Sequence, residues 1–210
     1  MEILKAIAEE LERGEAERAR ALTREAIAAG TPPAEILNRG LIAGMNVVGV
    51  RFRDREIFLP DVLMAAKAMY AGLDLLKPLL AGEGMPSRGR IVIGTVQGDL
   101  HDIGKNLVAI MLRGAGYDVI DLGNDVPTER FIATARESGA SLIGMSALLT
   151  TTMTGMRKVI ARIAEEGLQG KVRVIIGGAP VSADYAREIG ADAYAYDAAN
   201  AIERVRDLIP

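Results

Sequence analysis

The stretch RIVIGTVQGDLHDIGKNL, residues 90–107, passes from an apolar run through a polar, glycine-containing loop into a segment with the composition of a helix. A short apolar run bounded by a loop is typical of a buried strand, and strand followed by helix is the repeating unit of a parallel sheet. Four similar apolar runs follow along the chain: DVIDLG (118–123), SLIGMS (141–146), VRVIIGG (172–178) and DAYAY (192–196). Segments long enough for one helix separate these runs.

This alternation predicts an α/β domain in which a five-stranded parallel sheet carries helices on both faces. Five strands favour the flavodoxin-like, Rossmann-like order 2-1-3-4-5. In such a sheet, ligands bind beyond the carboxyl ends of the strands, near the point where the strand order reverses. The loops at 97–104, 146–152 and 177–181 are therefore expected to lie at one edge and to form a site.

The residues before this domain follow a helical period instead. One apolar series, spaced by three or four residues, runs from Leu37 to Phe52, and another runs from Val62 to Leu80. This pattern indicates a four-helix bundle. The predicted organisation is a helical cap domain at 1–84, a linker at 85–90 and the sheet domain at 91–210.

Composition excludes several classes of function. The net charge of −3 provides no basic surface for a phosphate backbone, so nucleic acid is not an expected partner. The chain has no cysteine and one histidine, which excludes thiolate and multi-histidine metal sites. The charged N-terminus MEILKAIAEELERGEAERAR differs from a signal peptide, and the longest uncharged run (138–156) is interrupted by Gly, Ser and Thr. We expect a cytoplasmic protein with no membrane association.

The single histidine, His101, lies in the loop between the first predicted strand and the helix after it. In one interpretation it is a polar residue at a helix entry, with Asp99 or Asp102 as the N-cap. In the other, His101 is an axial ligand of a macrocycle that supplies the remaining metal ligands itself, and Asp99 accepts the second ring N–H. One imidazole is sufficient only in the presence of such a macrocycle.

Three ordered elements decide between these interpretations. Asp99, His101 and Gly104 form Asp-x-His-x-x-Gly, Ser146 and Leu148 form Ser-x-Leu, and a Gly-Gly pair follows at 177–178. The gaps between the elements are 41 and 28 residues. Together they resemble the cobalamin-binding motif. The resemblance implies that a cobalamin or related corrinoid binds with His101 as its cobalt ligand. The implied corrinoid contacts are Gly98, Asp99, His101, Asp102, Ile103, Gly104, Ser146, Leu148, Thr150, Gly177 and Gly178.

The resemblance extends to the helical half. Residues 44–69 are similar to the cap of methionine synthase and of corrinoid proteins from methanol, methylamine, glycine betaine and methoxylated-aromatic methyltransferase systems. It implies that Phe52, Leu59 and Val62 cover the upper face of the corrin, although the same residues also suit a bundle core. Thr152 stands where methionine synthase has the serine of its histidine–aspartate relay. The implied catalytic set is therefore Asp99, His101 and Thr152.

The function implied by this resemblance is methyl transfer between partners in one-carbon metabolism, under anaerobic conditions. The corrinoid would accept a methyl group on cobalt(I) from a donor-specific methyltransferase. It would then pass the group from methyl-cobalt(III) to an acceptor such as tetrahydrofolate or a thiol, through a second, acceptor methyltransferase. A reductive activase is a third expected partner. The chain resembles a carrier subunit without a complete active site of its own, and the methyl donor stays open.

Three other functions are alternatives to the carrier. The cobalamin subunit of an adenosylcobalamin mutase shares the loop motif but usually lacks this cap. A cobalamin-dependent sensor or regulator would need a basic DNA-binding module and a tryptophan near the upper ligand, and the sequence contains no tryptophan. A receiver-like signalling domain would bind no cofactor.

Overall fold

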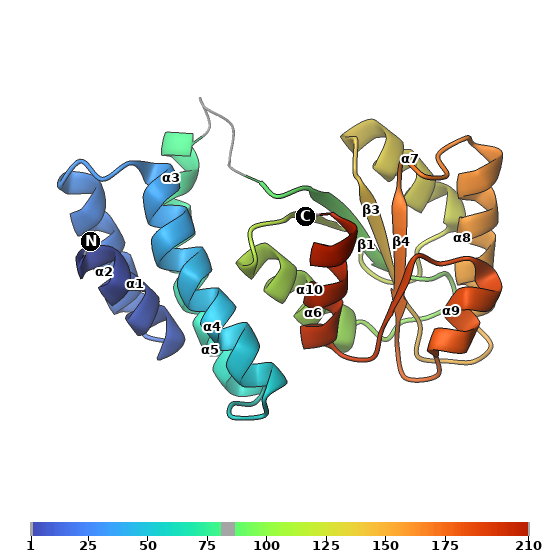
Figure 1. Ribbon diagram of the computed structural model, residues 1–210, viewed down its shortest axis with the longest axis horizontal. Helices are drawn as coiled ribbons and strands as arrows, with labels where there is room; N and C mark the ends of the chain where they lie inside the picture. The colour runs from blue at the N-terminus through green and yellow to red at the C-terminus, as the bar shows by residue number, and fades with distance from the viewer. Residues whose placement is uncertain (1, 81–86, 210) are drawn as a thin grey trace. The chain divides into compact units, whose positions relative to one another are not determined.

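The computed structural model describes residues 2–80 and 87–209, which form two compact units divided near Ser87 (Figure 1). The first unit contains the helices up to residue 80, and the second contains all five strands. The predicted end of the cap at residue 84 lies outside the described residues. The predicted linker, 85–90, lies partly outside them, and Arg90 is already the first residue of a strand.

The helical unit is the predicted four-helix bundle. Its third helix is continuous but changes its hydrogen-bonding pattern, because a seven-residue π-helical segment lies between two α-helical parts. The elements are α1 (Glu2–Glu12), α2 (Ala16–Ala28), α3 (Pro33–Glu35) with η1 (Ile36–Ile42) and α4 (Ala43–Arg53), and α5 (Leu59–Leu80). The bundle packs α1 against α2 and α4, and α2 against α5, around fully buried residues such as Ile7, Leu41 and Leu76.

The second unit contains a parallel sheet in the order β2-β1-β3-β4-β5, which confirms the predicted topology. Its strands are β1 (Arg90–Thr95), β2 (Asp118–Asp121), β3 (Leu142–Ser146), β4 (Arg173–Gly177) and β5 (Ala193–Ala195). Its helices are α6 (Ile103–Gly114), α7 (Thr128–Ser138), α8 (Thr154–Glu165), α9 (Ala183–Ile189) and α10 (Ala198–Leu208).

The two faces of this sheet differ. On one face, Val92, Ile143 and Ile176 pack into a continuous apolar core with α7, α8 and α9. On the other face, Ile91 and Leu142 point toward α6 and α10, and a cavity lies between the sheet and these helices. The alternation of neighbouring strand residues between the core and the cavity follows from the two-residue period of a strand.

None of the helices in the described part of the chain combines the length and apolar character needed to cross a membrane.

Candidate functional site

The carboxyl ends of four strands lie in one row. Thr95 of β1 pairs with Ser146 of β3, Ser146 pairs with Gly177 of β4, and Gly177 pairs with Ala195 of β5. The loops after β1, β3 and β4 therefore leave the sheet at the same level. The structure thus brings together the three loops that the sequence predicts to form a site.

The loop after β1 holds Asp99 in a fully buried position. Its Oδ1 lies 2.8 Å from Nδ1 of His101 and accepts the backbone N–H of His101 at 3.0 Å. Its Oδ2 accepts the backbone N–H groups of Leu148 at 2.7 Å and Leu149 at 3.2 Å, and lies 2.7 Å from the hydroxyl of Thr152. One carboxylate therefore joins the loops after β1 and β3.

These contacts keep Asp99 ionised. Burial raises the pKa of Asp99, but the hydrogen bonds from Leu148, Thr152 and His101 outweigh it, so that the pKa lies well below its usual range. An ionised carboxylate only accepts hydrogen bonds, so Nδ1 of His101 is the donor in this pair. In the neutral imidazole the lone pair is then on Nε2, the nitrogen available to a metal. The His101 side chain is 52% exposed, so a metal-containing group can approach it.

The hydroxyl of Thr152 extends this pair. Thr152 Oγ1 lies 2.7 Å from Oδ2 of Asp99 and 2.9 Å from the carbonyl oxygen of Leu149. A hydroxyl has one proton to donate, and the ionised carboxylate is the stronger acceptor. The structure therefore places Thr152, Asp99 and His101 in one hydrogen-bonded chain.

Apolar side chains with unusually high exposure flank His101. Leu100 is 68% exposed and Ile103 is 77% exposed, and Leu148 and Leu149 in the loop after β3 are each 43% exposed. Exposed apolar residues that gather at one place on a soluble protein indicate a binding surface. The sequence motif includes Ile103 and Leu148 but not Leu100 and Leu149, whose signal was their position inside the same two loops.

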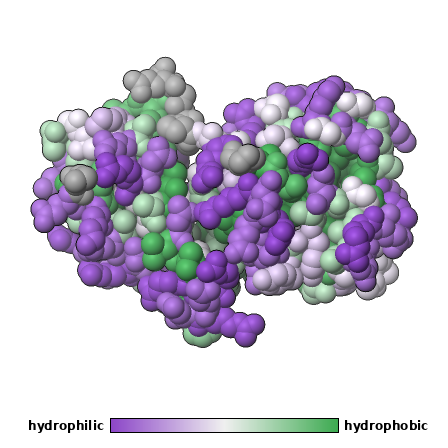
Figure 2. Space-filling model, viewed as in Figure 1, coloured by the Kyte–Doolittle hydropathy of each residue, from purple (hydrophilic) through white to green (hydrophobic). Residues whose placement is uncertain are grey.

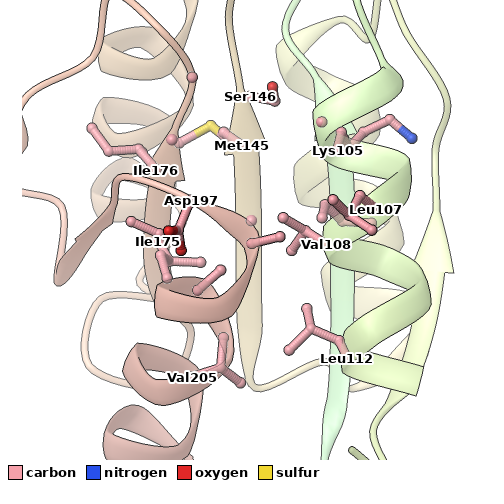
Figure 3. Close-up of a pocket in the computed structure, with 18 of the residues that line it drawn as sticks. Lys105, Leu107, Val108, Leu112, Met145, Ser146, Ile175, Ile176, Asp197 and Val205 are labelled. Atoms are coloured by element: carbon pink, nitrogen blue, oxygen red, sulfur yellow. The ribbon is translucent and has the colours of Figure 1, made fainter. Parts of the chain in front are cut away.

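A cavity of about 310 Å³ opens beside this surface and runs between α6, α10 and the sheet (Figure 3). Four motif residues line it: Gly104, Ser146, Gly177 and Gly178. Most of the other lining residues are aliphatic. A cavity of this volume, apolar with a few polar groups, has the character of a small-molecule site.

The sequence matches known families over both units. Residues 89–206 match a family described as "B12 binding domain", and residues 3–77 match a second family with the same description. The chain belongs to the B12-binding family. Its cofactor is cobalamin or a related corrinoid.

Several relatives of this B12-binding chain are named corrinoid proteins. A dimethylamine corrinoid protein of Methanosarcina acetivorans is 50% identical over 178 residues, which cover 84% of this chain and 84% of that protein. A corrinoid protein of Desulfitobacterium hafniense is 44% identical over 191 residues, which cover 90% of this chain and 88% of that protein.

Solved structures agree with the family. A chain of the methanol:cobalamin methyltransferase complex MtaBC from Methanosarcina barkeri matches with a TM-score of 0.92 and 34% identity, over 99% of this chain and 80% of that chain. A cobalamin-binding protein from Desulfitobacterium hafniense matches with a TM-score of 0.79 and 31% identity, over 99% of this chain and 98% of that chain.

Glycine occupies the positions of the B12-binding motif for different structural reasons. A Cβ on Gly178, whose φ is +124°, would lie 1.9 Å from the carbonyl oxygen of Ala147, so the close approach of two loops requires glycine there. A Cβ on Gly177 would lie 2.9 Å from the carbonyl oxygen of Ala195. A Cβ on Gly104 would meet no heavy atom within 4 Å. Folding therefore does not require glycine at position 104. Gly104 leaves open space at the cavity, which is better explained by a bound corrinoid.

The remaining predicted contacts lie around the loop after β1. The backbone N–H of Gly98 donates to Oδ1 of Asp125 at 2.7 Å, and the N–H of Asp125 donates to the carbonyl of Asp99 at 3.0 Å. Asp102 directly precedes α6, and its carbonyl accepts the N–H of Asn106. Thr150 is exposed in the loop after β3. Sequence reasoning missed Asp125, which fastens the loop after β2 to the histidine loop.

In the cap, Phe52 is half-buried and Leu59 is 37% exposed, whereas Val62 is fully buried. Val62 is thus a core residue of the bundle, and its implied contact with the corrin would require the bundle to repack. The exposed apolar residues of this region are Val47, Val50, Phe58, Leu59, Leu63 and Met64. Figure 2 shows apolar surface on the helical unit over α4 and α5.

Proposed function

We propose that the chain is the methyl carrier of a multi-component methyltransferase system. The observation that carries this proposal is the single imidazole of His101. Buried Asp99 holds this imidazole by Nδ1, so that Nε2 is free beside an exposed apolar surface and an open cavity. This arrangement suits a flat macrocycle with a metal at its centre and an appended tail.

Within this proposal the corrinoid supplies a cobalt centre that accepts and releases a methyl group, and the protein controls that centre. His101 would ligate the metal through Nε2. Asp99 holds the proton on Nδ1, and Thr152 together with two backbone N–H groups stabilises the carboxylate charge. Proton uptake by the Asp99–His101 pair would then compete with ligation by His101.

The cavity would hold the nucleotide tail of the corrinoid. Its mouth opens between the loops after β1, β3 and β4, and Gly104 and Gly144 leave space where side chains would project. A Cβ on Gly144, in the middle of β3, would make only ordinary contacts with Ile93 and Ile175 at 3.4 and 3.6 Å. The absence of a side chain there is consistent with a cavity that is kept open for a ligand.

The partners we propose are a donor-specific methyltransferase, an acceptor methyltransferase and a reductive activase, with tetrahydrofolate or a thiol as the acceptor. Dimethylamine is the first donor to test, because dimethylamine corrinoid proteins are among the most similar relatives. Methanol is the second, because the chain resembles part of a methanol methyltransferase complex.

The test is anaerobic loading with a corrinoid, reduction, and incubation with each donor and its purified methyltransferase. The loaded protein should become methylated with one donor and its enzyme, as followed by its absorption spectrum, and should stay unmethylated when that enzyme is omitted. A histidine-ligated, reduced protein that no dimethylamine, methylamine, methanol or methoxyarene methyltransferase can methylate would contradict the carrier function and favour a cobalamin sensor.

A further inference from the structure

The two ends of the cavity differ in polarity. Lys105, Ser146 and Asp197 lie on its lining toward the carboxyl edge of the sheet, whereas Leu112 and Val205 lie at its other end (Figure 3). The elements around it set its length. Leu142 and Ser146 are the first and last residues of β3, so the cavity extends along roughly 13 Å of strand at about 3.3 Å per residue. The cavity therefore has a polar mouth and a deep end.

The deep end is framed by aliphatic side chains from four elements. Ile91 of β1, Leu112 of α6, Leu142 of β3 and Val205 of α10 line it, and each is at most 1% exposed. The backbone groups of β1 and β3 pair with neighbouring strands. A group that enters this end meets carbon atoms and finds few hydrogen-bonding partners.

Two polar side chains at the mouth, those of Lys105 and Asp197, are already engaged. Nζ of Lys105 lies 2.6 and 2.7 Å from the two carboxylate oxygens of Asp121 and 2.6 Å from Oδ1 of Asn106, and Figure 3 shows its ammonium directed away from the cavity. Oδ1 of Asp197 accepts the N–H of Asn200 at 2.7 Å, capping α10. These groups are therefore held at the mouth and do not serve a polar atom at the deep end.

We propose that this cavity selects corrinoids by their lower base: it accepts an aromatic base whose buried edge carries only carbon and hydrogen, such as dimethylbenzimidazole, and discriminates against a purine. This inference rests on the proposed function, in which the corrinoid tail occupies the cavity. The physical reason is that the amino group and ring nitrogens of a purine would be buried without hydrogen-bonding partners. The free-energy cost of burying them exceeds the cost of losing the contacts that a methyl group of dimethylbenzimidazole makes.

The test compares three corrinoids on the full chain: cobalamin, its adenine-base counterpart, and cobinamide, which lacks the base. Equilibrium dialysis with absorbance detection gives each dissociation constant. We expect cobalamin to bind on the order of tenfold to a hundredfold more tightly than the adenine form. Cobinamide should bind more weakly than cobalamin, because it leaves the cavity without a ligand.

Two variants locate the source of this selectivity. Val205→Thr keeps the side-chain shape and replaces a methyl group by a hydroxyl at the deep end. Ala201→Ser adds a hydroxyl one helical turn earlier in α10, with little added volume. Either change should lower the preference for cobalamin over the adenine form by several fold. The matched control is Val174→Thr, at a buried position in the core on the opposite face of the sheet, which should leave the ratio unchanged.

The outcomes separate this inference from the function on which it rests. If cobalamin and the adenine form bind equally, the selectivity is absent and the inference is overturned, while histidine ligation and methyl transfer still support the carrier. A ratio that Val174→Thr alters as much as Val205→Thr and Ala201→Ser do would also overturn it. Failure to bind any of the three corrinoids would overturn both the inference and the proposed function.

Discussion

The hydroxyl of Thr152 lies 2.7 Å from Oδ2 of Asp99, on the opposite side of the carboxylate from the histidine ring, which lies 2.8 Å from Oδ1. Thr152 follows β3 and His101 follows β1, so this relationship depends on the pairing of two strands whose carboxyl ends lie at the same level. Each group that stabilises the carboxylate therefore influences the imidazole through Asp99.

Removing the Thr152 hydroxyl should shift the pH dependence of histidine ligation. Thr152→Val keeps the shape of the side chain but removes a hydrogen bond to a charged group, which raises the pKa of Asp99 and makes the Asp99–His101 pair more basic. The pH at which the histidine leaves the metal should rise by about one unit. The measurement is a spectroscopic pH titration of the corrinoid-loaded protein. Thr152→Ser, which keeps the hydroxyl, is the control, and an equal shift in both variants would contradict a role for the hydroxyl.

Asp99 should contribute stability that depends on pH. Because its pKa is lower in the folded protein than in the unfolded chain, its contribution is fully present above the unfolded pKa, near 4, and is lost as the pH falls toward the folded pKa. Asp99→Asn should therefore lower the free energy of unfolding by roughly 2–4 kcal/mol at pH 7 and by clearly less near pH 3. Denaturant unfolding of the corrinoid-free protein measures this, with Asp102→Asn as the neighbouring carboxylate control. A loss that stays constant over this pH range would contradict the account.

Two glycines of the motif should respond in opposite ways to alanine. Gly104→Ala should leave stability unchanged or raise it by up to about 1 kcal/mol, because the position is in a helix with open space around it, yet it should weaken corrinoid binding. Gly178→Ala should destabilise the sheet domain, because its Cβ would overlap the Ala147 carbonyl. Thermal unfolding and corrinoid binding, measured on both variants, separate the two effects. Unchanged corrinoid affinity in Gly104→Ala would remove this glycine from the binding site.

The cap residues should divide into core and surface. Val62→Ala should cost roughly 2 kcal/mol of stability, because it opens a cavity at a fully buried position. Leu59→Ala and Phe52→Ala should cost less stability and should instead speed photolysis of the methylated, corrinoid-loaded protein. The readouts are denaturant unfolding and the lifetime of the methylated form in light. If photolysis were unaltered in both Leu59→Ala and Phe52→Ala, their assignment to the covering face would fail.

Much of the fold could be predicted because its signals are local. The apolar runs and the helical segments between them determine five parallel strands, and the 2-1-3-4-5 order follows from how such units connect. The π-helical segment at Ile36–Ile42 was not predicted, because the apolar period of that helix does not show a change in hydrogen bonding. Val62 shows a related limit: the helical period marks it as apolar but does not distinguish a core position from a surface position that contacts a ligand.

The site was predicted less completely, because its bonds join segments far apart in sequence. The motif pointed to Asp99 and His101, but only the folded chain shows that the backbone N–H groups of Leu148 and Leu149 also bind the carboxylate. Almost any residue type can supply a backbone N–H donor, so the sequence does not indicate which residues do so. The ion pair between buried Lys105 and Asp121 was missed for a similar reason, since a lysine in the first turn of a helix is usually solvated and its partner lies 16 residues away.

The central claim is that His101 is the protein ligand of the corrinoid metal. Because His101 is the single histidine of the sequence, the claim can be tested directly. Protein labelled with nitrogen-15 only in histidine carries the label in one residue. Paramagnetic resonance of the reduced, cobalt(II) corrinoid-loaded protein then reports the nucleus of the axial nitrogen. Ligation by His101 predicts that each cobalt hyperfine line, a triplet in unlabelled protein, becomes a doublet in the labelled protein. Triplets that persist after labelling, or the absence of any axial nitrogen coupling, would contradict it.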